Sequence, residues 1–160
     1  MPRDKKLNLL RFKKSAHGIV EFATLLEQAE PSSRAAILEQ ATAQDEEFVF
    51  NVMRRIVYFE ELVYLDEAIL AELLSKVSPK VLAFALSDMP SEFREKMLRN
   101  LGVRDRRSFQ DEEEKIGGSF REGFVNGARK QILKFARKLE SENKFVFEVL
   151  GSPRLMKKSR

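Results

Sequence analysis

The sequence predicts an all-α fold, either a helical bundle or a short solenoid. Apolar residues recur at helical spacing along most of the chain, and proline, serine and glycine separate the periodic segments. Only residues 144–150, KFVFEVL, are typical of an extended strand. The chain has 160 residues, of which 43% are hydrophobic and 34% charged, so we expect a soluble protein with a substantial core.

The first helices are expected at residues 18–28 and 31–41. The apolar face of the first consists of Ile19, Phe22, Leu25 and Leu26. Pro31 suits the first turn of the second helix, because the N–H that proline lacks would have no partner there. Residues 17–53 are therefore predicted to form one small helical layer.

Four further helices are expected at residues 65–77, 80–87, 91–101 and 127–143. Asp66 is a candidate N-cap for the first of them, and Ser78 with Pro79 separates it from the next. Gly102 suits a left-handed C-terminal cap, because glycine adopts that conformation without steric cost. The pair Gly117–Gly118 is expected to break the chain before the last helix.

Composition excludes most kinds of chemistry. Thirteen Phe with no Trp and two Tyr favour a packed core over a polar ligand pocket. The absence of Cys, together with a single histidine, His17, predicts no disulfide, metal site or cofactor. Paired carboxylates such as Glu60 and Glu61 have no nucleophile or phosphate-binding loop beside them, so we predict that the protein is not an enzyme.

The basic charge lies at the two ends of the chain. Residues 1–14 hold six Lys or Arg and one Asp, and residues 151–160 hold four with no acid. The remainder therefore carries 29 − 10 = 19 basic and 25 − 1 = 24 acidic side chains, so a duplex-binding surface is not expected. No apolar run reaches the roughly 20 residues of a membrane span, and no secretory signal is visible, so we expect a cytoplasmic protein.

Several segments together resemble one family. IVYFEELVYLDEAILAELLSKV (56–77) resembles the C-terminal region of FliG, the flagellar motor switch protein family, and LAFALSDMPSEFREKMLRN (82–100) and ILKFARKLESENKFVFEV (132–149) are similar to later parts of it. The residues in register in the first segment are Phe59, Glu60, Leu62, Leu65, Asp66, Leu74 and Val77. HGIVEFATLLEQAEPSSRAAILEQ (17–40) is similar to an earlier part, with His17–Gly18 at the family's glycine hinge.

The resemblance implies a domain organisation. It implies an armadillo-like helical layer and linker at 17–57 and a six-helix domain at 58–150, between flexible basic tails at 1–16 and 151–160. The family's flexible M-F-V-F linker corresponds to Ile56, Val57, Tyr58 and Phe59. It further implies a non-enzymatic module at the cytoplasmic face of the flagellar basal body. The implied partners are rotor proteins of the FliM or FliG kind, with the cytoplasmic loop of the stator as a further one.

The resemblance also implies a charged interaction ridge. The family's ridge arginine, paired acids and later arginine correspond to Arg104, Asp111, Glu112 and Arg121. The family's ridge lysine is replaced by Ser87. In the same helix, Asp105, Arg106 and Glu113 stand where the family has core-facing apolar residues. Burying those charges unpaired would cost several kcal/mol each, so we expect this helix to be rotated, partly detached or frayed.

A second interface is expected on the layer at residues 17–57. In the family such layers stack on one another, and the layer here carries more apolar side chains than one small bundle is expected to bury. The predicted interface residues are Phe22, Leu25, Leu26, Ile37, Phe48, Val49 and Phe50. We expect this surface to self-associate into a homo-oligomer or to dock on a rotor protein.

Alternatives stay open at this point. Charged helix faces are usually ordinary solvated surface, and the ridge has that interpretation too. The protein could also be a helical adaptor or regulator outside the motor. The basic tails could aid solubility, contact anionic lipid or nucleic acid, or add a docking turn of helix through LNLLRF.

Overall fold

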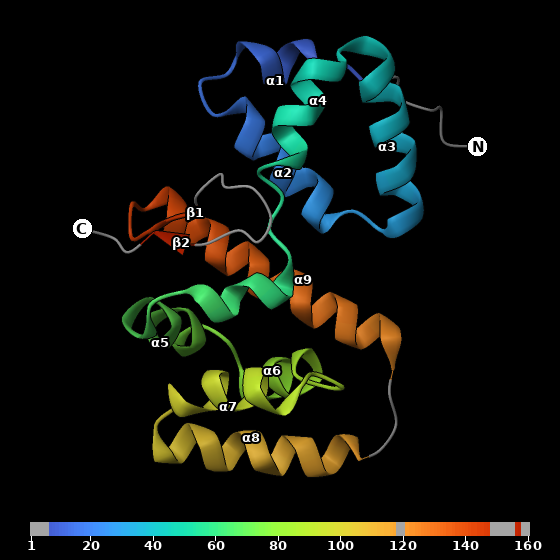
Figure 1. Ribbon diagram of the computed structural model, residues 1–160. Coiled ribbons are helices and arrows are strands. Elements are labelled where there is room, and N and C mark those ends of the chain that lie inside the picture. Colours follow the sequence, from blue (N-terminus) through green and yellow to red (C-terminus); the bar gives the residue numbers. More distant parts are fainter. Residues whose placement is uncertain (1–6, 118–120, 148–155, 158–160) are drawn as a thin grey trace. The chain divides into compact units, whose positions relative to one another are not determined.

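The computed structural model confirms the all-α prediction (Figure 1). It describes residues 7–117, 121–147 and 156–157. The described elements are α1 (Leu10–Lys14), α2 (Gly18–Gln28), α3 (Pro31–Gln44), α4 (Glu46–Met53), the 3₁₀ helix η1 (Phe59–Tyr64), α5 (Glu67–Ser75), α6 (Pro79–Ala85), α7 (Ser91–Arg99), α8 (Val103–Ile116), α9 (Glu122–Ser141), β1 (Val146–Phe147) and β2 (Met156–Lys157).

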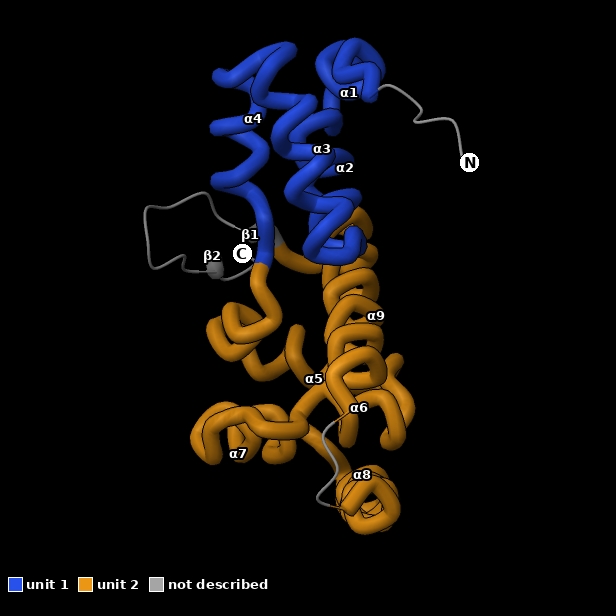
Figure 2. Tube along the Cα trace, turned by 90° about the vertical axis from the view of Figure 1, so that its right-hand side faces the viewer, with its two compact units in different colours: residues 1–57, 149–153 blue, residues 58–148, 154–160 orange. Residues whose placement is uncertain are grey.

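The chain divides into two compact units, coloured separately in Figure 2. Of the described residues, 7–57 form unit 1, and 58–117, 121–147 and 156–157 form unit 2. The division therefore falls between Val57 and Tyr58, within the segment 56–59 that was predicted to be a linker.

Unit 1 has a core to which α1, α2, α3 and α4 all contribute. The buried members are Leu9, Phe12, Phe22, Ala23, Leu26, Ala41, Val49, Val52 and Ile56. At its centre the ring of Phe12 meets the ring of Phe22 edge-on, with 4.9 Å between centroids. Phe48 approaches Phe22 in the same manner at 6.0 Å. Edge-to-face pairs at these distances add to the stabilisation that buried area alone provides.

The prediction of a flexible tail at 1–16 is wrong for the segment that forms α1. Leu9 and Phe12 are 2% and 5% exposed and belong to the core of unit 1. They are three residues apart, so they share one face of a helical turn. The basic residues around them obscured this short apolar face in the sequence. Residues 1–6 lie outside the described part of the chain.

Side chains of α3 hold the backbone that leads into α1. The Oε1 atom of Gln44 accepts a hydrogen bond from the Leu9 N–H at 3.4 Å, and its Nε2 donates to the Leu7 carbonyl at 2.6 Å. Gln40 Oε1 accepts from the Leu7 N–H at 3.2 Å. These bonds satisfy backbone groups that precede the first helical turn.

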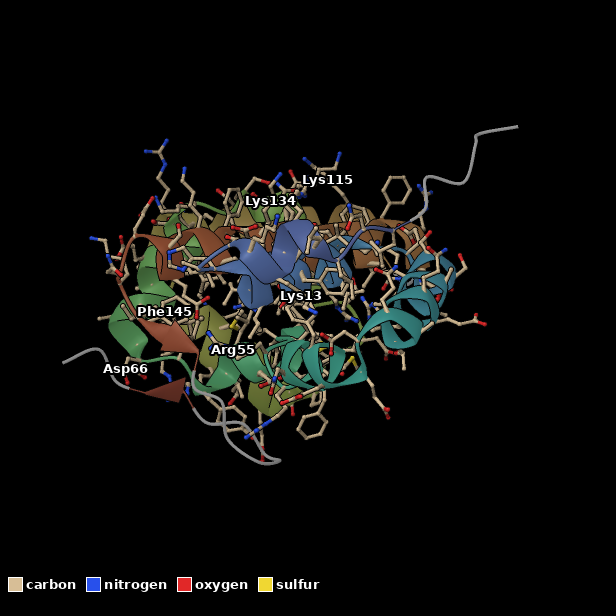
Figure 3. All side chains as sticks on the ribbon, turned by 90° about the horizontal axis from the view of Figure 1, so that it is seen from above. Lys13, Arg55, Asp66, Lys115, Lys134 and Phe145 are labelled. Carbon is tan, nitrogen blue, oxygen red and sulfur yellow. The ribbon has the colours of Figure 1, made fainter. Side chains whose placement is uncertain are left out.

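Asp45 joins α1 to the start of α4. Its Oδ1 accepts a hydrogen bond from the Phe48 N–H at 3.0 Å, which makes it the N-cap of α4. Its Oδ2 lies 2.6 Å from Nζ of Lys13, a residue labelled in Figure 3. The hydrogen bond from Lys13, and then that from Phe48, lower the pKa of the Asp45 carboxyl below its ordinary value.

Gly18 begins α2 at a point where no side chain fits. A Cβ atom on this residue would lie 1.6 Å from the carbonyl oxygen of Phe12. The sequence places His17–Gly18 where the family has a glycine hinge. In this chain Gly18 has a further role, because only glycine lets the end of α1 approach α2 this closely.

Unit 2 is closed by its last helix. Helix α9 is 20 residues long and contacts η1, α5 and α6. Its buried apolar residues are Val125, Ala128, Ile132, Leu133, Ala136 and Leu139. They recur at three- and four-residue intervals, as expected for one buried helical face.

The helix ends of unit 2 follow the sequence signals in part. Ser78 Oγ accepts a hydrogen bond from the Val81 N–H at 3.3 Å, and Pro79 begins α6 as expected. Asp66 occupies the N-cap position of α5, but its side chain makes no capping hydrogen bond. The prediction for Gly102 is wrong. Its φ is −65°, and it is the N-cap of α8 rather than a left-handed cap of α7.

The end of unit 2 contains a short two-stranded sheet. Strands β1 and β2 are antiparallel, with Val146 opposite Lys157 and Phe147 opposite Met156. The expected extended segment at 144–150 is thus confirmed for residues 146 and 147. The disordered tail predicted at 151–160 is wrong for β2, and the other residues of that tail lie outside the described part of the chain. Phe145, labelled in Figure 3 beside β1, is 2% exposed.

Candidate interaction surfaces

Helix α8 carries most of the predicted ridge and has one buried residue. Phe109 is 1% exposed, and α8 packs mainly on α6. The helix ends at Gly117, whose φ of 62° lies in the left-handed region that glycine tolerates. The 14 residues of α8 are continuous and Phe109 is buried, so two of the three expected alternatives, a frayed and a partly detached helix, are wrong, while a rotated helix stays a prediction.

The charges that motivated that prediction are accommodated in two ways. Asp105 and Arg106 are exposed, so neither is buried without a partner. Glu113 is partly buried and forms an ion pair with Arg94 of α7. The same guanidinium donates to the Leu86 carbonyl at 2.8 Å. This partner comes from a different helix, so the spacing of residues within α8 could not reveal it.

Two of the four predicted ridge residues share the outer side of α8. Arg104 and Asp111 are both exposed, and they are seven residues apart, which corresponds to about two helical turns. They therefore lie on the same face, roughly 10 Å apart along the helix axis. The structure presents this pair to solvent as a surface of mixed charge.

The other two ridge residues lie at a hollow in unit 2. Glu112 is turned by about 100° from Asp111, and its side chain is 26% exposed. Its Oε1 lies 3.3 Å from Nζ of Lys115. Glu112 and Arg121 line a pocket of about 260 Å³. We call this the α6–α8–α9 pocket; its lining residues are Lys80, Phe84, Glu112, Lys115, Ile116 and Arg121.

Arg129 is a structural residue that the sequence analysis did not single out. Its Nε and NH2 donate to the carbonyl oxygens of Ala85 and Ser87 at 2.9 and 2.8 Å, at the C-terminal end of α6. The guanidinium also lies 5.4 Å from the centre of the Phe59 ring. Burial lowers the pKa of Arg129 below its ordinary value, while Glu60 and Asp88 act in the opposite direction.

A signal for Arg129 was present in the sequence. The residue lies four positions after Val125 and three before Ile132, on the side of α9 that carries the buried residues. An arginine at such a position needs acceptors, because its buried N–H groups cannot be left without hydrogen bonds. The sequence could not identify those acceptors, since they are backbone carbonyls more than 40 residues away.

The predicted apolar interface of unit 1 is largely its core. Phe22, Leu26 and Val49 are 0%, 0% and 7% exposed, so their assignment to a surface is wrong. Ile37 and Phe48 are partly buried against the same core. The reason is that α1 and its N-cap, in the segment predicted to be a flexible tail, contribute Phe12 and Leu9 to this core.

A smaller exposed set remains on unit 1. Of the predicted residues, Leu25 is 36% and Phe50 62% exposed. Met53 is 41% exposed and lies three residues after Phe50, so the two share a face of α4. Met53 was missed because no helix had been assigned to this stretch.

The predicted linker residues differ in their surroundings. Ile56 and Val57 are 3% and 2% exposed, and the Val57 N–H donates to Oε2 of Glu27 at 2.9 Å. Tyr58 is 51% exposed, and its N–H donates to Oε1 of Glu61 at 3.1 Å at the start of η1. Phe59 is buried, and the centre of its ring lies 5.4 Å from the centre of the Phe93 ring.

Further features of the described residues concern metal-binding clusters, membrane-spanning helices and hollows. No cluster of three or more His, Cys, Asp or Glu within them could hold a metal ion. No helix in that part of the chain is both long and apolar enough to cross a membrane. A second hollow in unit 2, of about 390 Å³, has both buried apolar residues such as Leu74, Leu82 and Phe109 and exposed polar residues such as Lys76 and Asp105 in its lining.

Comparisons with known proteins agree with this architecture. The family model described as "FliG C-terminal domain" matches residues 39–147. The flagellar motor switch protein FliG of Thermotoga maritima is 26% identical over 139 residues, covering 87% of this chain and 41% of the relative. That of Borreliella burgdorferi is 24% identical over 132 residues, covering 82% and 38%. The chain thus spans about 40% of the length of these curated relatives.

Solved structures show the same fold. The crystal structure of FliG (residues 86–343) from H. pylori superimposes with a TM-score of 0.60 at 21% identity, covering 81% of this chain and 60% of that one. Full-length FliG from Aquifex aeolicus gives a TM-score of 0.53 at 23% identity, covering 80% and 40%.

Proposed function

The chain belongs to the FliG C-terminal domain family, and from this premise we propose that it is a non-enzymatic protein-interaction module of the bacterial flagellar motor switch. Its partners are rotor proteins of the FliM or FliG kind, and its place is the cytoplasmic face of the basal body. The stator loop is a second partner. We rank the stator loop below the rotor proteins as a partner, because Ser87 replaces the family's ridge lysine.

One observation supports this proposal most directly. The family match extends from residue 39 to residue 147 and so includes segments of both units, from α3 to β1. Within that range the resemblance matches Arg104 and Asp111 to charges that the family uses for interaction, and both are exposed on a helix anchored by Phe109. An exposed, rigidly held charge pair can steer and orient a partner of complementary charge.

Charge reversal on α8 tests the proposed ridge. We expect Arg104→Glu, and separately Asp111→Lys, to reduce swimming speed or rotor localisation in the native cell. The thermal midpoint should stay nearly unchanged, because exposed ion pairs contribute only about 0–1 kcal/mol. Motility, localisation and protein abundance are measured together with thermal unfolding of each purified variant.

The matched control changes the same charge on another helix. Lys134 is exposed on α9, and Lys134→Glu should leave motility and localisation as they are. If both ridge variants swim and localise normally at unchanged abundance, this face is ordinary solvated surface and not an interaction ridge. A loss of several kcal/mol of stability would instead identify a structural network.

A second test concerns the exposed apolar face of α4. We expect Phe50→Ser with Met53→Ser to weaken self-association or binding to a rotor protein by about tenfold, as for loss of an interface hot spot. Both side chains are exposed, so unfolding should change little. Light scattering and pull-down with purified FliM or FliG provide the measurement.

The control for this face is another exposed apolar residue. Val103 of α8 is 81% exposed, and Val103→Ser should have no effect on association. A protein that is a strict monomer and recovers no rotor protein, with or without these substitutions, would contradict an interface on unit 1.

A further inference from the structure

The α6–α8–α9 pocket combines positive charge with one acid. Its rim carries the cations Lys80, Lys115 and Arg121 and the carboxylate Glu112. That carboxylate is already close to Lys115, at 3.3 Å. In the part of the chain that the structure describes, neither Lys80 nor Arg121 forms an ion pair. The pocket therefore offers two cations to a ligand of negative charge.

The same pocket has an aromatic side. Phe84, which lines it, stacks against Phe124 with 5.5 Å between ring centroids and 25° between ring planes. Phe124 is nevertheless 58% exposed, and the guanidinium of Arg121 lies 5.8 Å from its ring centre. A large ring that stays more than half exposed beside a pocket is suited to packing against an apolar group from outside.

The size of the pocket narrows the class of ligand. Its volume of about 260 Å³ lies below the roughly 300–1,000 Å³ that small-molecule sites occupy, so one side chain of a partner suits it better than a metabolite. Nucleic acid is disfavoured, because Glu112 lies in the pocket and Asp111 and Glu114 are exposed on the same helix. A phosphate backbone would approach these carboxylates.

We propose that the α6–α8–α9 pocket binds an acidic protein segment. One apolar side chain of that segment packs against Phe84 and Phe124, and its carboxylates pair with Lys80 and Arg121. The inference rests on the proposed function and deepens it by stating the chemistry of the partner. Arg104 and Asp111 then orient the encounter, while the pocket holds the bound segment.

The test uses a defined probe. A fluorescein-labelled peptide with one phenylalanine between two runs of three acidic residues is titrated with the full chain and followed by fluorescence anisotropy. Two comparison peptides replace the acids with lysine or the phenylalanine with alanine, and an oligothymidylate serves as the nucleic-acid probe. We expect the acidic phenylalanine peptide to bind best, and added salt to weaken its binding.

Substitutions in the pocket sharpen the result. Lys80→Glu and Phe124→Ala should each weaken binding of the acidic phenylalanine peptide by about five- to tenfold, since each removes a direct contact. Lys134→Glu and Val103→Ala are the matched controls and should not change it. Lys134 follows Arg121 by 13 residues, or roughly 20 Å along α9, and Lys134 and Lys115 are labelled in Figure 3. Circular dichroism confirms that each variant is folded.

Three outcomes overturn the inference. They are equal binding of the acidic and basic peptides, equal loss in the pocket and control variants, and tighter binding of the oligothymidylate. The proposed function fails separately. If the peptide binds as expected while ridge and pocket variants leave motility and rotor binding intact, the pocket inference is supported and the proposed motor function is contradicted. If the peptide fails while ridge variants disrupt rotor binding, only the pocket inference falls.

Discussion

Gly18→Ala should destabilise unit 1 by about 3 kcal/mol or more. The added Cβ would lie 1.6 Å from the Phe12 carbonyl oxygen, a backbone atom that cannot rotate away. Relief requires α1 to shift, which withdraws Phe12 from Phe22 and opens the core. Overpacking usually costs about 1–3 kcal/mol, and a backbone clash lies at or beyond the upper end. Urea unfolding and hydrogen exchange of the α1 and α2 amides provide the measurement.

The matched control is the same substitution on α9. A Cβ at Gly127 meets no atom within 4 Å among the described residues, and the position is inside a helix. Gly127→Ala should therefore stabilise unit 2 by roughly 0.5–1 kcal/mol through helix propensity. If Gly18→Ala has the stability and exchange pattern of the unsubstituted protein, α1 does not pack on α2 as described.

Phe109→Ala should lower the free energy of unfolding of unit 2 by about 3–5 kcal/mol. Phe109 is the one fully buried side chain of α8 among the described residues, and the guanidinium of Arg94 lies 6.0 Å from its ring centre. Truncation removes the apolar anchor of the helix and leaves a cavity that its neighbours fill only in part. The urea midpoint of unit 2 reports the loss, and interaction of the ridge with rotor proteins should fall with it.

Gln110→Ala is the control within the same helix. Gln110 is exposed, so its substitution should change the free energy of unfolding by less than about 0.5 kcal/mol. This pair complements the charge reversals on α8. Phe109→Ala should lower both stability and binding, whereas Arg104→Glu should lower binding alone. If Phe109→Ala and Gln110→Ala are equally stable, packing of α8 does not depend on the Phe109 ring.

Helices with a strong apolar period were predictable from the sequence. Helix α2 has the predicted bounds, and α5, α6 and α7 begin within two residues of theirs. Their signals are local, because Pro79 and Ser78 specify the start of α6 through the backbone geometry of one turn. Helix α1 was expected only as an alternative, a docking turn within LNLLRF, because five residues carry too little periodicity and their helix depends on packing rather than on propensity.

The surfaces were less predictable than the helices. Arg104 and Asp111 are exposed, and the resemblance indicated them residue by residue. The pairing of Glu113 with Arg94 was not predictable, because these residues lie on different helices and their proximity depends on how α7 and α8 pack. The α6–α8–α9 pocket has the same origin, since Lys80 precedes Arg121 by 41 positions and folding alone brings them to one hollow.

The position of α9 near the end of unit 2 has a consequence during synthesis on the ribosome. Unit 1 has all its described helices once residue 57 has emerged, whereas η1, α5 and α6 wait for α9, which ends at Ser141. The interval is 141 − 57 = 84 residues, or roughly 4–17 s at the usual elongation rates. During it, apolar residues of α5 and α6 that are buried in the complete unit 2, such as Leu70 and Leu82, remain accessible to chaperones.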